Sequence, residues 1–349
     1  MPTSPSSEGN QLGRTMQAEM LQQPTTLAHL LDRRDEVAEQ VRRLAPVPLA
    51  GTVLVARGSS DHAATCGRYY LEMATRRPVA STSPSLATMY HSSTDFSGYL
   101  MVAVSQSGRT PEIVEVTERA RRAGAKAIAV TNDAASPLAL AADLVVDLSA
   151  GEERAVPATK TVTAQVTAFA MIAQALGDIG LTDSAARQLP GQVSEVLADQ
   201  ASAAAVAAWL APHDRLVTVA RGLLYGAAAE TALKVEETTA RITAAFSAAD
   251  LRHGPIAMAA AGPPVLAFGH PGPASADLVD LVRELVARGA DCRLAGPLEG
   301  SELRWPEEAP EVLAPVLAVV RGQQVALELA RLLGRDPDAP EGLTKVTIT

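Results

Sequence analysis

Cysteine is nearly absent from this 349-residue chain, and aromatic residues make up only 3% of it. The two cysteines, Cys66 and Cys292, are isolated in the sequence, which excludes a disulfide scaffold and a cysteine-based metal site. Because hydrophobic residues still reach 47%, we expect Ala, Val and Leu to fill a substantial core. The six histidines are scattered and no carboxylate cluster accompanies them, so the sequence implies no metal and no organic cofactor.

An excess of basic charge is also missing. The net charge is −9 and the pI is near 5.3, whereas a nucleic-acid-binding protein needs a basic face. No apolar run reaches the roughly 18 residues that a membrane helix requires. The N-terminus lacks the basic-then-apolar layout of a signal peptide. We therefore expect a cytoplasmic protein with neither nucleic acid nor membrane as a partner.

Strand-like and helix-like segments alternate along most of the chain. Continuous Val, Ile and Leu strands separated by helices predict a parallel sheet covered on both faces. We expect strands at 52–57, 78–82, 99–105, 126–131, 143–148, 215–221, 264–269, 291–296 and 311–316. We expect helices at 16–44 (with a break near "QQPTT"), 62–75, 111–124, 159–176, 190–212 and 224–239.

The tetrapeptide Val-Ala-Arg-Gly occurs at 55–58 and again at 219–222, each time at the end of a predicted strand. This repetition suggests two copies of one α/β unit. We therefore predict an α/β fold with two tandem, doubly wound, flavodoxin-like domains. The predicted segments are a disordered tail at 1–15, a helical arm at 16–45, the two domains at 46–182 and 183–335, and a C-terminal tail at 336–349.

Two predicted strands of the first half end in loops rich in Gly and Ser. The loop after 99–105 continues into "RTPE", where Thr110 and Pro111 suit the N-cap and the first position of a helix. Its free N–H groups would then face the loop, as in an anion site. Neither a Walker loop nor a dinucleotide fingerprint is present, and the loop has no lysine, so a small phosphate monoester fits better than a triphosphate. The alternative is that such loops are simply good turns.

Six motifs then point to one family. "RGSSDHA", "SQSGRTPE", "GEERAVPATKT", "ALKVEE", "LRHGP" and the final "GLTKVTIT" together resemble the sugar isomerase (SIS) domain family. The resemblance is to the isomerase half of glucosamine-6-phosphate synthase, and still more to stand-alone proteins of the glucosamine-6-phosphate deaminase and fructosamine deglycase type. No N-terminal cysteine nucleophile is present, so we do not expect glutamine-driven amination. The resemblance implies that a sugar phosphate is bound by Ser59, Ser60, Ser105, Gln106, Ser107, Thr110, Val156 and Ala158.

Lys234 and Glu237 are three residues apart on a predicted helix and therefore share a face. That spacing alone suits a surface ion pair, but the apolar flanks indicate a largely buried helix, in which charged groups need a reason. The resemblance implies that Glu237 moves a proton between C1 and C2 of the open-chain sugar. It also implies that Lys234 stabilises the enediolate or enolamine that forms.

His253 precedes a Gly-Pro turn, and Lys345 lies four residues from the end of the chain. By themselves, a lone histidine is usually structural and a terminal lysine is usually solvated. The resemblance implies instead that His253 assists ring opening, often from the neighbouring subunit of a homodimer. It also implies that the tail folds over the active site and brings Lys345 to the sugar.

The segment before His253 departs from the family pattern. Ile242, Ala244 and Ala248 replace a usual His, Glu and Ser, and Ala158 stands where the synthase has Ser. This less polar setting leaves three reactions open for an amino-sugar phosphate. The first expectation is isomerisation or deamination of glucosamine 6-phosphate or a close analogue. The second is a lyase that dehydrates N-acetylglucosamine 6-phosphate through loss of the C3 hydroxyl. A non-catalytic sugar-phosphate sensor is the alternative of another class.

Overall fold

The computed structural model describes residues 12–259 and 262–345, and it divides into two compact units. The first unit comprises Thr25–Glu152 and Lys160–Arg187. The second unit comprises the segment that ends at Pro24, together with Glu153–Thr159 and Gln188–Lys345. These units differ from the sequence-based spans. The first helix, the 153–159 loop and the C-terminal tail group with the second half, residues 25–45 of the predicted arm group with the first unit, and the first unit extends to Arg187.

The first unit contains a five-stranded parallel sheet of order β2-β1-β3-β4-β5. This is the flavodoxin-like strand order, which places a topological switch point between β1 and β3. Three of its strands, β1, β3 and β4, are lined with buried Val, Ile, Leu, Met and Ala, whereas only Val146 of β5 is buried. The strands are β1 (Gly51–Val55), β2 (Val79–Ser81), β3 (Tyr99–Val104), β4 (Lys126–Thr131) and β5 (Leu144–Asp147).

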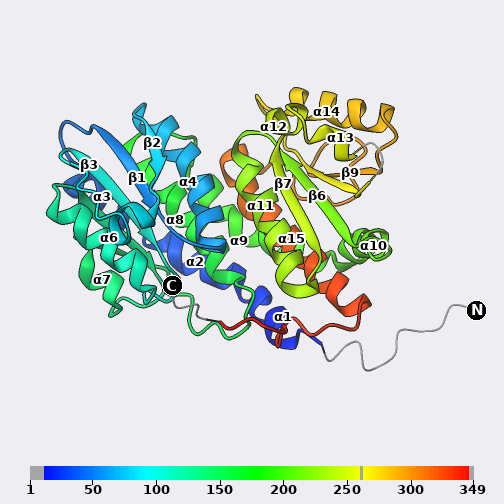
Figure 1. Cartoon of the computed structure of the whole chain (residues 1–349), viewed down its shortest axis with the longest axis horizontal. Helices are drawn as coiled ribbons and strands as arrows, with labels where there is room; N and C mark the ends of the chain where they lie inside the picture. Colours follow the sequence, from blue (N-terminus) through cyan, green and yellow to red (C-terminus); the bar gives the residue numbers. More distant parts are fainter. Residues whose placement is uncertain (1–11, 260–261, 346–349) are drawn as a thin grey trace, which may run out of the picture. The chain divides into compact units, whose positions relative to one another are not determined.

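Helices cover both faces of this sheet (Figure 1). Val53, Val55, Met101 and Ala103 alternate along two strands and pack in one core with α6 and α7. On the other face α4 packs closely against α8. The helices of this region are α2 (Gln23–Asp32), α3 (Arg34–Leu44), α4 (Ser59–Thr75), α5 (Pro84–Thr88), α6 (Pro111–Arg122), α7 (Pro137–Ala141) and α8 (Lys160–Leu176).

The second unit contains a four-stranded parallel sheet of order β7-β6-β8-β9, which repeats the first four positions of the other sheet. Its strands are β6 (Arg215–Ala220), β7 (Ile242–Ser247), β8 (Val265–Phe268) and β9 (Cys292–Ala295). Helices α11 and α15 pack together beside β6 and β7, whereas α12 and α14 lie on the opposite face (Figure 1). The α/β architecture with two parallel sheets confirms the predicted fold class.

The remaining helical segments complete the chain. They are α1 (Arg14–Leu21), α9 (Asp183–Ala198), α10 (Gln200–Leu210), η2 (Gly222–Leu224), α11 (Tyr225–Thr239), α12 (Ala248–Arg252), α13 (Ile256–Ala259), α14 (Ser275–Ala287), η3 (Glu311–Leu313) and α15 (Ala314–Leu332). Helix α9 spans the boundary of the two units. Because α1 begins at Arg14, the expected disordered tail is wrong for its last two residues, and residues 1–11 lie outside the described residues.

The strand expected at 311–316 is wrong. This segment forms η3 and the start of α15, where Pro315 occupies the first turn and removes a donor that a central strand would need. The sequence reading also missed β7, whose "ITAAFS" carries few branched residues. The single helix expected at 190–212 is two helices, α9 and α10, because the Asp199 side chain accepts from the Ser202 N–H and caps a new start.

Helix α15 also bears on the expectation that no segment could cross a membrane. The stretch Glu311–Leu332 is long and apolar enough to do so, with a mean hydropathy of 1.4. However, 94% of that window is buried inside the structure. This degree of burial is typical of the core helix of a globular unit, because a core helix can be apolar all round.

Candidate functional site

In the first unit, the loop Ser105–Thr110 joins β3 to α6, and we call it the hydroxyl loop. The Gly108 N–H donates to both the backbone oxygen and Oγ of Ser105, and Ser105 Oγ lies 3.4 Å from Thr110 Oγ1. Ser105 is buried, whereas Gln106, Ser107 and Thr110 are partly exposed. The loop therefore gathers hydroxyl and amide groups at the carboxyl end of a central strand, where open α/β sheets bind ligands.

Two features fix this loop in place. The Gln106 carbonyl accepts from the Asn132 N–H at 3.0 Å and from Thr131 Oγ1 at 3.3 Å. Gly108 has φ +62°, and a Cβ there would lie 2.1 Å from Ser136 Oγ, so only glycine fits. Thr110 is the N-cap of α6, as expected, but its side chain caps no N–H of the helix. Its hydroxyl contacts Ser105 Oγ, and it lies at the positive end of the helix dipole, where an anionic ligand would bind.

Ser59 and Ser60 begin α4, directly after Gly58. Ser60 is buried, and its Oγ accepts a hydrogen bond of 3.0 Å from Nε2 of Gln165, a buried residue of α8. Because the Ser60 oxygen is already an acceptor, its hydroxyl hydrogen is left to act as a donor. Gln165 was not predicted from sequence. Its Oε1 is buried without a protein partner, which marks this spot as one that a ligand or water would complete.

In the second unit, α11 carries a buried cluster of charged groups. Lys234 is fully buried, and its Nζ lies 3.3 Å from Oε1 of the buried Glu230 and forms an ion pair with Oε2 of Glu237. Glu237 is 21% exposed, so it is the member of the cluster that solvent or a substrate can reach. Sequence analysis missed Glu230, although its spacing of four residues from Lys234 is a signal for a second partner.

Burial and the neighbouring charges together set the pKa values of this cluster. Burial raises the pKa of Glu237, and the Glu230 charge adds to the increase, which outweighs the opposing effects of Lys234 and Lys345. Burial lowers the pKa of Lys234, but its two carboxylate neighbours raise it by more, so the ammonium form is favoured. A carboxylate with a raised pKa beside a permanent positive charge is suited to accept and return a proton.

The loop Glu153–Thr159, which contains the predicted residues Val156 and Ala158, lies in the second unit. The Glu153 carboxylate accepts from the Thr159 N–H at 3.0 Å and from Lys345 Nζ at 2.8 Å. The structure thus places the predicted tail lysine on this loop. Its positive charge partly opposes the rise in the pKa of Glu237 that burial causes. Val156 and Ala158 are half-buried.

His253 is exposed and follows the last residue of α12. Its backbone N–H donates to the Asp250 carbonyl. Within the described residues, no hydrogen bond or ion pair links its ring to Lys234 or Glu237. The same residues contain no group of three or more His, Cys, Asp and Glu that could hold a metal ion.

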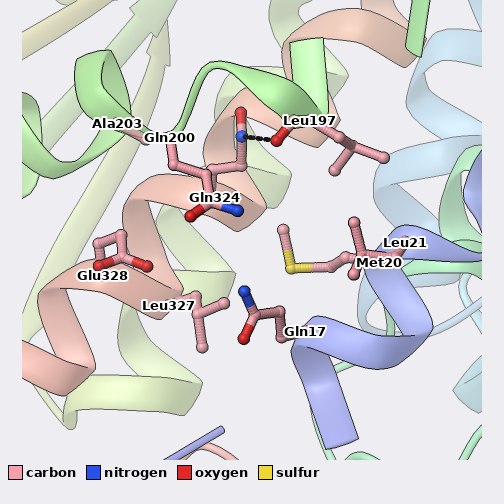
Figure 2. A pocket seen from close by; sticks show the side chains of 9 residues that line it. All are labelled: Gln17, Met20, Leu21, Leu197, Gln200, Ala203, Gln324, Leu327 and Glu328. Carbon is pink, nitrogen blue, oxygen red and sulfur yellow. Dashed lines mark hydrogen bonds between the residues drawn. The ribbon is translucent and has the colours of Figure 1, made fainter. Parts of the chain in front are cut away.

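A small pocket of the second unit is separate from these groups (Figure 2). Gln17, Met20 and Leu21 of α1 face Leu327 and Gln324 of α15 across it, and the Gln324 amide donates to the Leu197 carbonyl. Its cavity volume is about 20 Å³. That space holds about one water, so the pocket is far too small for a sugar phosphate. It shows instead how closely α1 packs on α15.

One sequence signal could have revealed more of the site. The chain has only four lysines, against a large excess of arginine, and they are Lys126, Lys160, Lys234 and Lys345. Two of them are fully buried. A residue type that is otherwise avoided and is buried where it occurs indicates a specific role. By contrast, Glu19 accepts from the N–H groups of Arg154 and Ala155 across more than 130 residues of sequence, and no local pattern predicts that contact.

Two parallel sheets of related strand order, with polar loops at strand ends, define a doubly wound α/β protein with an internal repeat. The sequence pattern of the SIS domain matches residues 52–175 and 209–295, which is more than half of the chain. The chain therefore belongs to the SIS domain family.

Three similar proteins illustrate the range of the family. A curated glutamine–fructose-6-phosphate aminotransferase (isomerizing) from Symbiobacterium thermophilum is 32% identical over 355 residues, which cover 95% of this chain but 58% of the relative. A crystal structure from Silicibacter pomeroyi, described provisionally as a phosphosugar isomerase, is 32% identical with a TM-score of 0.84, covering 93% of this chain and 99% of that one. A glucosamine-6-phosphate deaminase from Thermotoga maritima has 21% identity and a TM-score of 0.73, covering 93% and 99%, and it shows the fold alone.

Proposed function

We propose that this chain is an amino-sugar-phosphate isomerase or deaminase that acts on glucosamine 6-phosphate or a close analogue. The observation that carries the proposal is the buried Glu237–Lys234–Glu230 cluster, in which a partly accessible carboxylate has a raised pKa. Membership of the SIS family and the names of the relatives support a phosphorylated sugar as the substrate class. The chain spans 58% of the length of the first curated relative, so that protein's complete activity is not assumed.

The hydroxyl loop, Ser59 and Ser60 bind the phosphate in this proposal, and the loop holding Val156 and Ala158 contributes backbone contacts. Glu237 removes the C2 proton of the open-chain aldose, and the electron pair moves to give an enolamine. The Lys234 ammonium stabilises the oxygen that becomes negative. Return of the proton to C1 gives an imine at C2, and water hydrolyses it to fructose 6-phosphate and ammonia. With an oxygen in place of the nitrogen, the same proton transfer is an aldose–ketose isomerisation.

Ammonia release from glucosamine 6-phosphate tests the proposal. The wild-type protein should release ammonia, and Glu237→Gln should lower kcat by about 10²–10⁴-fold, the usual contribution of a positioned acid–base group. The neighbouring Glu236→Gln is the matched control, because Glu236 is exposed and its carboxylate only accepts from Thr243 Oγ1. No ammonia release above the blank would rule out deamination, and Glu237→Gln with wild-type activity would remove Glu237 from the reaction.

The pH dependence gives a second arm of this test. Glu237 must be ionised to accept a proton, and burial raises its pKa above the ordinary value of 4.5. The rate should therefore rise with pH along a limb that lies above pH 4.5. Since the folded state holds this proton more tightly than the unfolded chain, Glu237 also makes unfolding easier as pH rises from 4.5 through its raised pKa. A rate limb at or below pH 4.5 would contradict this assignment.

The quaternary structure stays a prediction. We predict a cytoplasmic homodimer in which His253 of one subunit assists ring opening, and light scattering of the purified protein tests the dimer. The dehydratase alternative gains no support from the names of the relatives described above. If Glu237→Gln were fully functional in vivo, that result would favour the non-catalytic sensor alternative.

A further inference from the structure

Helix α1 has no N-cap side chain of its own, because its N-cap is Gly13. The carboxylate of Asp338, from the segment after α15, takes that role. Its two oxygens accept from the Thr15 N–H at 2.7 Å and from the Met16 N–H at 2.8 Å. Asp336 accepts from the Gly13 N–H at 2.9 Å. The C-terminal segment therefore fixes the start of α1, and the negative charge of Asp338 lies at the positive end of the helix dipole.

The other end of α1 holds the 153–159 loop. Glu19 is 4% exposed, and its two carboxylate oxygens accept from the backbone N–H groups of Arg154 and Ala155. Two N–H donors on one carboxylate define the direction of the loop at that point. The adjacent Met20 of α1 is buried and faces α15, and Glu19 itself is buried, so its carboxylate is held in place rather than free at the surface (Figure 2).

The loop in turn holds the C-terminal tail. The Glu153 side chain has no exposed surface, and it joins the Thr159 N–H to the Lys345 ammonium. Gln323 of α15 donates to the Thr159 carbonyl at 3.1 Å and anchors the far end of the loop. The three segments thus form a closed circuit: the tail caps α1, α1 holds the loop, and the loop holds the tail through Lys345.

The Lys345 amine lies close to the acidic side chains of the circuit. Glu19 and Glu153 are two buried carboxylates, and Lys345 is within electrostatic reach of both. Burial raises the pKa of Glu19, and the neighbouring Glu153 charge raises it further, whereas Lys345 lowers it. Each carboxylate accepts from N–H groups of the loop, and the Lys345 ammonium adds an opposite charge, which further stabilises carboxylates that are buried.

We propose that Glu19 and Glu153 are positioning residues that hold the Lys345 amine in place, and that Asp338 contributes by capping α1. We call these contacts of Glu19, Glu153 and Asp338 the clamp. The consequence for catalysis rests on the proposed function, because it requires Lys345 to act on the sugar. The clamp itself does not depend on the reaction, and it can be tested without substrate.

Lysine labelling measures the clamp directly. The intact protein is treated with a trace of acetic anhydride at fixed pH, and mass spectrometry quantifies acetylation at each lysine. Exposed Lys126 is the internal reference, and buried Lys160 and Lys234 report loss of the fold. Glu153→Gln should raise Lys345 labelling by about tenfold, since a charge-assisted hydrogen bond is lost. Glu341→Gln, an exposed change on the same tail, is the matched control.

Two further variants keep the proposal falsifiable. Asp338→Asn weakens the cap of α1 without touching Glu153 or Lys345, and Glu19→Gln weakens the loop contact; both should raise Lys345 labelling by a smaller factor than Glu153→Gln does. If Glu153→Gln exposes Lys160 and Lys234, it has unfolded, and the other two variants decide the question. Wild-type labelling of Lys345 in every folded variant would overturn the clamp.

Kinetics separate this inference from the proposed function. If the protein releases ammonia as proposed, Glu19→Gln should lower kcat several-fold and leave KM nearly unchanged, because Glu19 acts through Lys345 and not on the phosphate. Glu153→Asp should restore part of the loss seen in Glu153→Gln. If Lys345 labelling changes as expected but the protein releases no ammonia, the clamp is supported and the proposed function is ruled out. If Lys345 labelling is unchanged in the variants but the wild-type protein releases ammonia, the proposed function is supported and the clamp is ruled out.

Discussion

After β3 the chain enters the hydroxyl loop, and after β8, the equivalent third strand of the other sheet, it enters Gly269–Ala274. Both loops lead into a helix of at least 12 residues and lie at the switch point of their sheet. The first loop presents partly exposed Ser, Gln and Thr side chains. The second presents buried His270, two prolines and two glycines. Equivalent positions in one repeated fold have therefore acquired different chemistry.

The second switch point is filled by its own side chains. The Trp305 Nε1–H donates to His270 Nδ1 at 3.2 Å, the two rings stack, and the His270 ring also bonds to the backbone of Ala309. Glu311 lies against Gly272. The cavity that remains is about 10 Å³, roughly one water. This comparison shows that strand order alone does not make a binding site, because the loop side chains decide whether the crevice stays available.

One ion pair is kept in both copies. Arg57, after β1, pairs with Glu112 in the first turn of α6, and Arg221, after β6, pairs with Asp277 in the first turn of α14. Both arginines belong to the repeated Val-Ala-Arg-Gly segment. The feature that persists is the one that joins the end of the first strand to the helix after the third, which indicates a structural role for the tetrapeptide.

The two loops should differ most in how much a glycine-to-alanine substitution lowers the free energy of unfolding. Gly108→Ala places a Cβ 2.1 Å from Ser136 Oγ at φ +62°, and it should destabilise the protein by about 2–4 kcal/mol. Gly272→Ala meets only the end of the Glu311 side chain, which can move, so about 1 kcal/mol or less is expected. Urea unfolding measures both changes. Equal losses would show that the two loops are equally constrained.

His270 should matter for stability and not for activity. His270→Ala leaves the Trp305 N–H without its acceptor and should cost about 2–3 kcal/mol, with kcat unchanged. Burial lowers the pKa of His270 below 6.5, so the unfolded chain binds the extra proton. Wild-type stability should therefore fall as pH drops below 6.5, and this fall should be shallower in His270→Ala. His213→Gln is the control, and thermal unfolding between pH 5 and 8 is the measurement.

The smallest expected difference concerns single hydroxyls. Ser107→Ala should raise KM for the sugar phosphate by about tenfold, since one hydrogen bond to a charged group is lost. Ser275→Ala, at the start of α14, should leave KM unchanged, because Ser275 Oγ only donates to the Gly272 carbonyl. Steady-state kinetics of both variants make the comparison. An equal rise in KM for both would assign phosphate contacts to the second loop as well.

The fold was predictable from sequence where strands are continuous and branched, as in β1, β3, β4 and β6. It was not predictable where composition is ambiguous: β7 contains four small or polar residues among six, and the start of α15 resembles a strand until Pro315. In such segments tertiary packing, rather than local preference, decides the structure.

The candidate site divides in the same way. The shared face of Lys234 and Glu237 followed from their spacing, and the structure places them in an ion pair. The positions of Glu19 and Glu153 did not follow, because their contacts depend on chain segments that meet only after folding. Gln165 carries no motif either. Its role follows from one hydrogen bond to Ser60.

Solvent exchange at the substrate carbon tests the central claim most directly. When fructose 6-phosphate is incubated with the protein in D₂O, proton NMR should show loss of a C1 hydrogen signal, because the carboxylate of α11 exchanges the proton that it carries. Glu237→Gln should abolish this exchange, and Glu236→Gln should retain it. Exchange at the wild-type rate in Glu237→Gln, with the fold intact, would contradict the account.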